Sequence, residues 1–133
     1  MAVAYSKLSK PAKVRLRARR DALTKITRAM TEYPYYVAGS SRLDTLLMEV
    51  TGGRLVAKLG AERVYCVGVM EKGIGIALKI EDGSSRAIDT VVIELLKRLK
   101  IISGVEYGRL KQRCKTEIRN HRKETIGEIK TVF

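Results

Sequence analysis

The sequence predicts an α+β protein in which a small antiparallel sheet is flanked by helices. Three short apolar runs, residues 54–60, 63–70 and 74–80, follow one another with connections of only a few residues. A parallel crossover needs a dozen or more residues, so these runs favour a three-strand antiparallel meander. Segments with helical periodicity lie before and after the runs rather than between them, which is the pattern of helices segregated from a sheet.

The composition indicates one globular domain. The chain has 133 residues, of which 45% are hydrophobic, and it contains two cysteines and no tryptophan. No apolar run approaches the roughly 20 residues that cross a bilayer, and the N-terminus lacks the apolar region of a secretory signal. We therefore expect a cytoplasmic, reduced protein without a membrane partner.

The positive charge of the chain is concentrated at its two ends. The formal net charge is +13, yet residues 1–20 hold seven basic and no acidic side chains, and residues 111–133 hold seven basic and three acidic ones. The remainder is nearly neutral. We expect residues 1–20 to form a solvated basic arm or linker and residues 21–133 to form the domain. A nucleic-acid-binding or assembly module is the alternative, but nucleic acid is not the partner that we expect.

Two helices are predicted before the sheet. The first begins at Asp21, a residue typical of helix starts, because apolar side chains follow at three- and four-residue steps as far as Tyr33. Pro34 ends this helix. A second, shorter helix is predicted for residues 44–50, and the Gly52-Gly53 pair ends it.

The third predicted strand alternates in character. Its isoleucines and leucine point one way, and Gly75, Ala77 and Lys79 point the other way. After it, Ser84 or Ser85 begins a strongly amphipathic helix that we expect to pack on the apolar face of the sheet and to end near Gly104. Its apolar stripe consists of Ile88, Val91, Val92, Leu95, Leu96 and Leu99. Residues 125–133 are predicted to be a final strand, added to the same sheet or at its edge.

Few residues of the sequence indicate a catalytic or ligand-binding site. Nucleophile-elbow, phosphate-loop and zinc-protease motifs do not occur in the sequence, and neither does a Ser-x-x-Lys tetrapeptide. His121 lies in a polar run and is expected on the surface. Cys66 is expected to be a buried, small apolar side chain in the middle of a strand. Gly73-Ile74-Gly75 is expected to form a hairpin turn.

Lys58 is the strongest candidate for a functional residue. It lies in the predicted strand 54–60 among small and apolar neighbours. A desolvated lysine needs a partner, and it can act as a base or as an electrostatic anchor for a carboxylate. The other interpretation is a lysine at the edge or end of the sheet that extends to water. The periodicity of the strand alone leaves both open.

Three stretches carry a resemblance to a known family. They are VAGSSRLDT (37–45), TGGRLVAKLGAERVYC (51–66) and KGIGIALKIEDG (72–83), with Asn120-His121-Arg122 and Gly127-Glu128-Ile129 further along. Together they resemble the C-terminal part of the L-asparaginase II family, the serine-dependent asparaginases. The resemblance implies the C-terminal portion of a β-lactamase or penicillin-binding-protein-like fold.

The resemblance also implies an activity and a set of site residues. In this family a serine attacks the side-chain amide of L-asparagine, lysines act as its bases, and aspartate and ammonia are released without a cofactor. Lys58 matches the second catalytic lysine. Arg42, Asp44, Gly60 and Ala61 match positions that we expect to line the substrate site. In the rhizobial branch a cysteine that helps to hold zinc stands at the position of Asp44, so we expect no metal here.

Besides Asp44, the sequence departs from the family pattern in two further ways. Leu59 stands where the family has glycine. The Ser-x-x-Lys and Asn-Asn-Cys-Ser-Gly-Lys-His segments of the family are expected upstream of this region. We therefore expect a C-terminal piece that is inactive alone and that joins the N-terminal half of the same enzyme or a companion subunit. A homodimer is compatible with this expectation.

Overall fold

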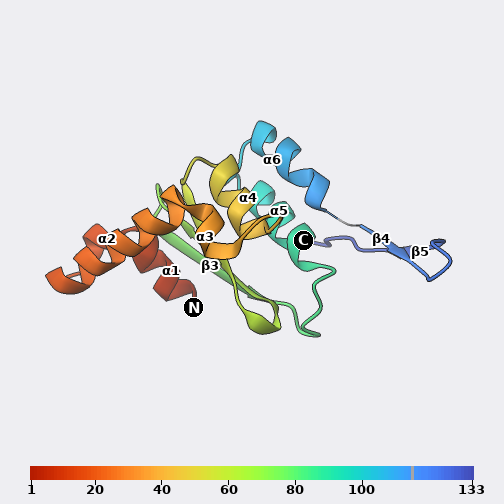
Figure 1. Ribbon diagram of the computed structural model, residues 1–133, viewed down its shortest axis with the longest axis horizontal. Helices are drawn as coiled ribbons and strands as arrows, with labels where there is room; N and C mark the ends of the chain where they lie inside the picture. The colour runs from red at the N-terminus through yellow and green to blue at the C-terminus, as the bar shows by residue number, and fades with distance from the viewer. Residues whose placement is uncertain (115) are drawn as a thin grey trace. The chain divides into compact units, whose positions relative to one another are not determined.

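The computed structural model describes residues 1–114 and 116–133, and it is an α+β structure (Figure 1). The chain divides into two compact units, residues 1–79 and 80–133. The first contains α1 (Ala2–Ser9), α2 (Arg17–Glu32), α3 (Pro34–Ala38), α4 (Leu43–Val50), β1 (Leu55–Leu59), β2 (Val64–Val69) and β3 (Ile74–Lys79). The second contains α5 (Ile88–Arg98), α6 (Gly104–Leu110), β4 (Glu117–Arg119) and β5 (Thr125–Glu128). Single 3₁₀ turns occur at Pro11–Lys13, Ala61–Arg63 and Lys111–Arg113.

The predicted meander is confirmed. The three strands of the first unit pair in the order β1-β2-β3, and both pairings are antiparallel. Lys58 lies opposite Cys66, which lies opposite Ala77 on the next strand. Because directly paired residues share a face of the sheet, these three positions form one row on the same face. Gly73 closes the β2–β3 hairpin with a φ of +65°, as expected for a glycine turn.

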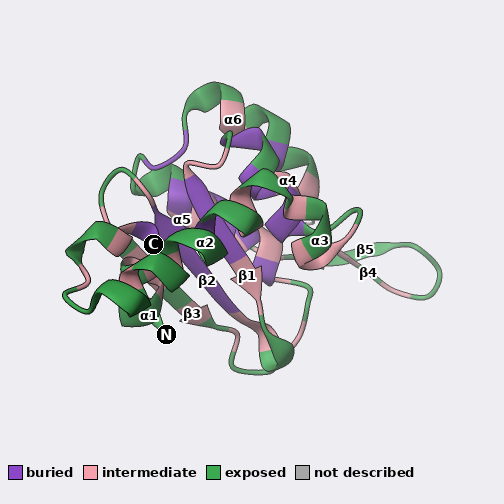
Figure 2. Ribbon diagram, turned by 60° about the vertical axis from the view of Figure 1, so that its left-hand side comes forward, coloured by how far each residue is buried: buried purple, intermediate pink, exposed green. Residues whose placement is uncertain are grey.

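The core of the first unit lies between α4 and the strands. Figure 2 shows that α4, β1 and β2 carry many buried residues. Their almost completely buried apolar residues include Leu43, Leu47, Met48, Leu55, Val56, Ala57, Tyr65, Val67 and Val69. The predicted short helix over residues 44–50 is confirmed, and α4 begins one residue earlier, at Leu43. This packing fixes the N-terminal end of α4 against β1.

The expected solvated arm over residues 1–20 is instead largely folded. Residues Ala2–Ser9 form α1, which packs on β2 and β3. The approach is close because the sheet presents glycines there: a Cβ at Gly75 would lie 1.9 Å from the carbonyl oxygen of Ala2. Ser9 is 3% exposed, and the Thr27 hydroxyl of α2 donates a hydrogen bond to the carbonyl oxygen of Leu8 at 2.9 Å. These contacts hold α1 between the sheet and α2.

The ends of the second and third helices also differ from expectation. Helix α2 begins at Arg17 rather than at Asp21, and it ends at Glu32. Pro34 does follow the end of α2, but it also opens α3, where proline is tolerated because the first turn of a helix leaves its N–H groups unpaired. The chain therefore turns at Tyr33 and continues as a helix.

In the second unit, α5 is shorter than predicted. It begins at Ile88 with Ala87 at its N-cap, so neither Ser84 nor Ser85 caps it, and it ends at Arg98, before Gly104. Its buried residues include Ile88, Val92, Ile93 and Leu96, whereas Leu99 is 47% exposed. The buried stripe is thus rotated toward Ile93. That α5 covers the apolar face of the sheet stays a prediction.

Gly104 is the first residue of α6 and does not end α5. Ser103 accepts a hydrogen bond from the backbone of Glu106, and the Glu106 carboxylate accepts one from the backbone of Ser103 at 2.7 Å. This reciprocal capping box explains why α6 begins at a glycine.

The expected C-terminal strand over residues 125–133 is wrong in its extent and in its partner. Only Thr125–Glu128 is a strand, and it pairs with Glu117–Arg119 in a separate two-stranded antiparallel sheet. Local pairing of neighbouring segments competes with addition to a distant sheet edge, and here the local hairpin forms. None of the helices in residues 1–114 and 116–133 is both long and apolar enough to span a bilayer.

Candidate functional site

The structure brings together two of the predicted site residues, Lys58 and Asp44. The Lys58 ammonium lies 3.6 Å from a carboxylate oxygen of Asp44 and donates a hydrogen bond of 2.9 Å to the carbonyl oxygen of Leu59. The Asp44 side chain is 1% exposed, whereas the Lys58 side chain is 41% exposed. The site therefore consists of a buried carboxylate that faces an ammonium with access to solvent.

Asp44 is held at the open edge of the sheet. Strand β1 pairs only with β2 in its sheet, so the other side of β1 carries backbone groups without a strand partner. The Leu59 N–H donates to the same Asp44 oxygen at 3.0 Å. Asp44 occupies the first turn of α4, where the helix dipole favours a negative charge. The Asp44 carboxylate thus accepts a hydrogen bond from the edge of β1, pairs with Lys58, and lies at the end of α4 where a negative charge is favourable.

The remaining predicted site residues are close to this pair in the chain and are exposed. Arg42 is the exposed N-cap residue of α4, two positions before Asp44. No ion pair of Arg42 is found in the part of the chain that the structure describes. Gly60 and Ala61 follow β1 directly and are exposed, and the Gly60 N–H donates to the Val64 carbonyl oxygen at 2.7 Å.

Sequence reasoning missed Tyr5, which α1 brings to the same region. Burial, followed by the nearby Cys66 and Asp44, raises the pKa of Tyr5 to about 12. The phenol is therefore neutral at physiological pH and can donate or accept a hydrogen bond. Cys66 is 1% exposed, as expected, and burial raises the pKa of its thiol. A thiol with a raised pKa carries little thiolate, so Cys66 is not an activated nucleophile.

A signal for Tyr5 exists in the sequence, but it is weak. Ala2, Tyr5, Ser6 and Ser9 recur at helical spacing, and they make up the face of α1 toward the sheet. Most of these side chains are small or polar, so hydrophobic periodicity does not predict the helix that forms here. Glycines opposite such a face indicate close helix–sheet packing only when the register of the strands is known.

Replacement of Asp44 is expected to destabilise the protein. Asp44→Ala leaves the Leu59 N–H without its acceptor and should cost about 1–3 kcal/mol of the free energy of unfolding. Asp44→Asn keeps an acceptor oxygen and should cost less. Urea denaturation measures both, with Glu49→Ala on the exposed side of α4 as the control. Equal stability of Asp44→Ala and Glu49→Ala would contradict the role of this carboxylate.

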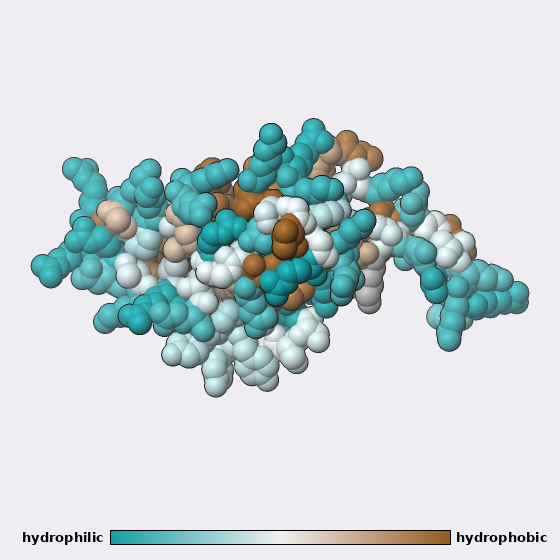
Figure 3. Space-filling view, turned by 90° about the horizontal axis from the view of Figure 1, so that it is seen from above, coloured by the Kyte–Doolittle hydropathy of each residue, from teal (hydrophilic) through white to brown (hydrophobic). Residues whose placement is uncertain are grey.

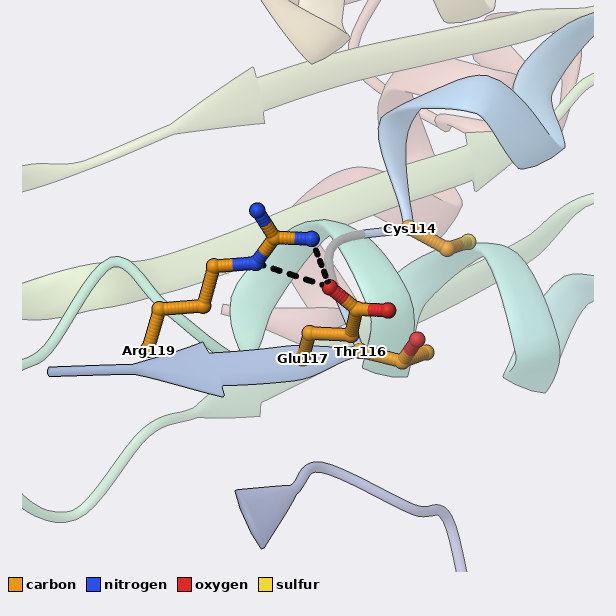
Figure 4. A pocket seen from close by; sticks show the side chains of 4 residues that line it. All are labelled: Cys114, Thr116, Glu117 and Arg119. Atoms are coloured by element: carbon orange, nitrogen blue, oxygen red, sulfur yellow. Dashed lines mark hydrogen bonds and ion pairs between the residues drawn. The ribbon is translucent and has the colours of Figure 1, made fainter. Parts of the chain in front are cut away.

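A hollow in the other unit lacks chemistry comparable to that of the Lys58–Asp44 pair. It has a volume of about 400 Å³ and is lined by Cys114, Thr116, Glu117 and Arg119. The Arg119 guanidinium is turned to the Glu117 carboxylate (Figure 4), with 2.9 Å between its Nε and the carboxylate oxygen. Burial is the main cause that raises the pKa of Cys114. This hollow therefore offers a paired cation and an unreactive thiol.

His121 is exposed, as expected for a surface histidine. Within residues 1–114 and 116–133, no three His, Cys, Asp or Glu side chains gather closely enough to hold a metal ion. The candidate site is thus defined by Lys58 and Asp44, with Tyr5 nearby.

Comparison with models of protein families gives a match over nearly the whole chain. The family model described as L-asparaginase II matches residues 1–131, a range that includes α1 and both residues of the central pair. No curated protein matches the chain.

Proposed function

The chain belongs to the L-asparaginase II family, and on that premise we propose that it supplies the catalytic-site lysine, Lys58, and one wall of the pocket of an enzyme that hydrolyses L-asparagine. The observation that carries the proposal is the Lys58–Asp44 pair at the open edge of β1. An ammonium with one buried counter-charge and one solvent-facing side is positioned to meet a ligand from solvent.

The proposed chemistry uses Lys58 at the reacting amide. A serine hydroxyl attacks the amide carbon of asparagine, and the carbonyl oxygen gains negative charge in the tetrahedral intermediate. With a neutral amine, a lysine beside the nucleophile can take the hydroxyl proton and pass it to the amide nitrogen that leaves as ammonia, whereas a lysine in its ammonium form can stabilise the developing negative charge. Both roles need a fixed position of the lysine Nζ, which the Leu59 carbonyl and Asp44 support.

Asp44 is proposed to position Lys58 rather than to contact substrate. Its side chain is 1% exposed, and it already accepts the Leu59 N–H. Arg42 is better suited to substrate because it is exposed and a guanidinium binds a carboxylate through two parallel hydrogen bonds. We propose that Arg42 binds the α-carboxylate of asparagine.

Gly60 and Ala61 are proposed to form the pocket wall beyond Lys58. A Cβ at Gly60 would make only ordinary contacts, the nearest at 3.6 Å from the Val64 carbonyl oxygen. Packing of the chain therefore does not demand glycine at this position. In the β-lactamase-like arrangement that we propose, β1 corresponds to the strand that lines the substrate site.

The nucleophile is proposed to come from a Ser-x-x-Lys segment, which this sequence does not contain. That segment would belong to an N-terminal half of the enzyme, either covalently linked or as a companion subunit. The substrate is L-asparagine.

Reconstitution tests the proposal. The purified chain alone should release ammonia from asparagine no faster than buffer, because residues that act as one catalytic unit lose nearly all activity when one member is missing. Addition of the N-terminal half of a family enzyme, which bears Ser-x-x-Lys, should restore ammonia release. Strong activity of the chain alone would overturn the proposal and would make Ser40, Ser41 and Thr45 the nucleophiles to test.

A further inference from the structure

A basic cleft lies in the first unit, where α1 ends and α2 begins. It has a volume of about 600 Å³, and five cationic side chains line it: Lys7, Lys10, Lys13, Arg15 and Arg19. No acidic side chain is among the residues described around it. In Figure 3, hydrophilic side chains dominate the left-hand end, where α2 begins in Figure 1. We call this feature the basic cleft.

The cations of the basic cleft differ from their neighbours in lacking partners. Arg17 and Arg20 point to Asp21 at 3.8 and 4.0 Å, and further along α2 the Arg28 guanidinium contacts Glu32 at 2.7 Å. In contrast, none of the five cleft cations pairs with a carboxylate of residues 1–114 and 116–133. Uncompensated like charges around a hollow create a positive potential that attracts anions.

One of these lysines, Lys10, packs against the β2–β3 turn. The Lys10 side chain crosses the β2–β3 turn so closely that a Cβ at Gly73 would lie 2.9 Å from its Cδ. The first turn of α2 contains arginines and no acidic residue. The helix dipole places partial positive charge at the same end, so it adds to the positive potential of the basic cleft. A side chain held by packing loses less conformational entropy when it binds a ligand.

We propose that the basic cleft binds an oligophosphate, an anion with two or more linked phosphate groups. Five cations would be poorly matched by a single carboxylate, whereas a phosphate chain supplies several charges in a small volume. Lysines bind phosphate as point charges, and arginines bind it through paired hydrogen bonds. A hollow of about 600 Å³ is in the range of small-molecule sites.

The described lining favours an oligophosphate over a nucleic-acid strand. Single strands are bound through aromatic side chains on which bases stack, and none of the residues described around the basic cleft is aromatic. The apolar lining residues are Val14 and Leu16, which offer a limited surface. The phosphate chain can be inorganic or can belong to a nucleotide, and the experiment distinguishes these sources.

Calorimetric titration of the full chain with inorganic triphosphate, at low salt and at physiological salt, tests the proposal. Triphosphate should bind more tightly than monophosphate at both salt concentrations. Lys10→Met with Lys13→Met should weaken triphosphate binding about tenfold or more, because charge-assisted hydrogen bonds are lost. Lys111→Met with Lys123→Met removes the same charge from exposed positions of the other unit and should leave the affinity nearly unchanged.

Three further titrations complete the test: the Lys10→Arg variant with triphosphate, and the original chain with ATP and with a single-stranded oligonucleotide. Lys10→Arg keeps the charge and should keep the binding, which separates loss of charge from misfolding. Equal affinity for triphosphate and ATP indicates the inorganic source, and tighter binding of ATP indicates a nucleotide. Three results would overturn the proposal: no triphosphate binding, equal loss in both double variants, or a single-stranded oligonucleotide that binds more tightly than either phosphate ligand.

Discussion

Lys58→Met is expected to reduce asparagine hydrolysis by the reconstituted enzyme about 10²- to 10⁴-fold, the range that a positioned acid–base group contributes. Methionine has nearly the length of lysine but carries no charge, so the fold should tolerate it. The Lys58 side chain is 41% exposed, and its carboxylate partner keeps the Leu59 N–H as a donor. The loss should therefore appear in kcat rather than in assembly.

The control for this variant is Lys72→Met. Lys72 is an exposed residue of the β2–β3 turn, so its substitution removes the same charge away from the proposed site. Lys79 is a poorer control, because its pairing with Val64 places it on the same face of the sheet as Lys58. Steady-state ammonia release measures both variants. Equal losses in Lys58→Met and Lys72→Met would show that Lys58 has no specific role.

Gly75→Ala is expected to produce the largest loss of stability, about 3 kcal/mol or more of the free energy of unfolding, at the upper end for overpacking. The new methyl group would lie 1.9 Å from the Ala2 carbonyl oxygen and 2.4 Å from the Ser6 nitrogen. Both are backbone atoms of α1, so a rotamer change cannot relieve the clash. The helix must move away from the sheet, and the packing of α1 on β2 and β3 is lost.

Gly108→Ala is the matched control. Gly108 lies in α6, and nothing lies within 4 Å of a Cβ built there. Alanine has a higher helix propensity than glycine, so this variant should gain up to about 1 kcal/mol. Urea denaturation gives both free energies. A Gly75→Ala protein as stable as the original would show that α1 does not pack on the sheet as described.

Lys58→Met and Gly75→Ala also distinguish the proposed catalytic role of Lys58 from the structural role of α1 packing on the sheet. Lys58→Met should change activity with little effect on stability. Gly75→Ala should change stability first, and activity only because α1 carries Tyr5 toward Cys66 and Asp44. Measurement of both quantities on both variants tells a chemical role from a structural one.

The sequence by itself determined the meander, α4 and the family. Each rests on a local pattern: alternation along β3, short connections at residues 60–63 and 70–73, and spaced leucines in α4. Side-chain alternation and turn residues act over a few positions, so they can be recognised without knowledge of the rest of the fold. The expectation of a buried Cys66 and of an exposed His121 followed from the same local reasoning.

Only the tertiary structure decided the role of residues 1–20, the pairing of the last strand and the partner of Lys58. Helix α1 packs through small side chains against Gly68 and Gly75, and such a face carries no hydrophobic period. Thr125–Glu128 had two possible pairings, and the nearby β4 is the one that forms. Asp44 precedes Lys58 by fourteen positions, and the two meet only because α4 packs beside the open edge of β1. Contacts between distant segments depend on how whole elements pack, and local patterns do not specify that packing.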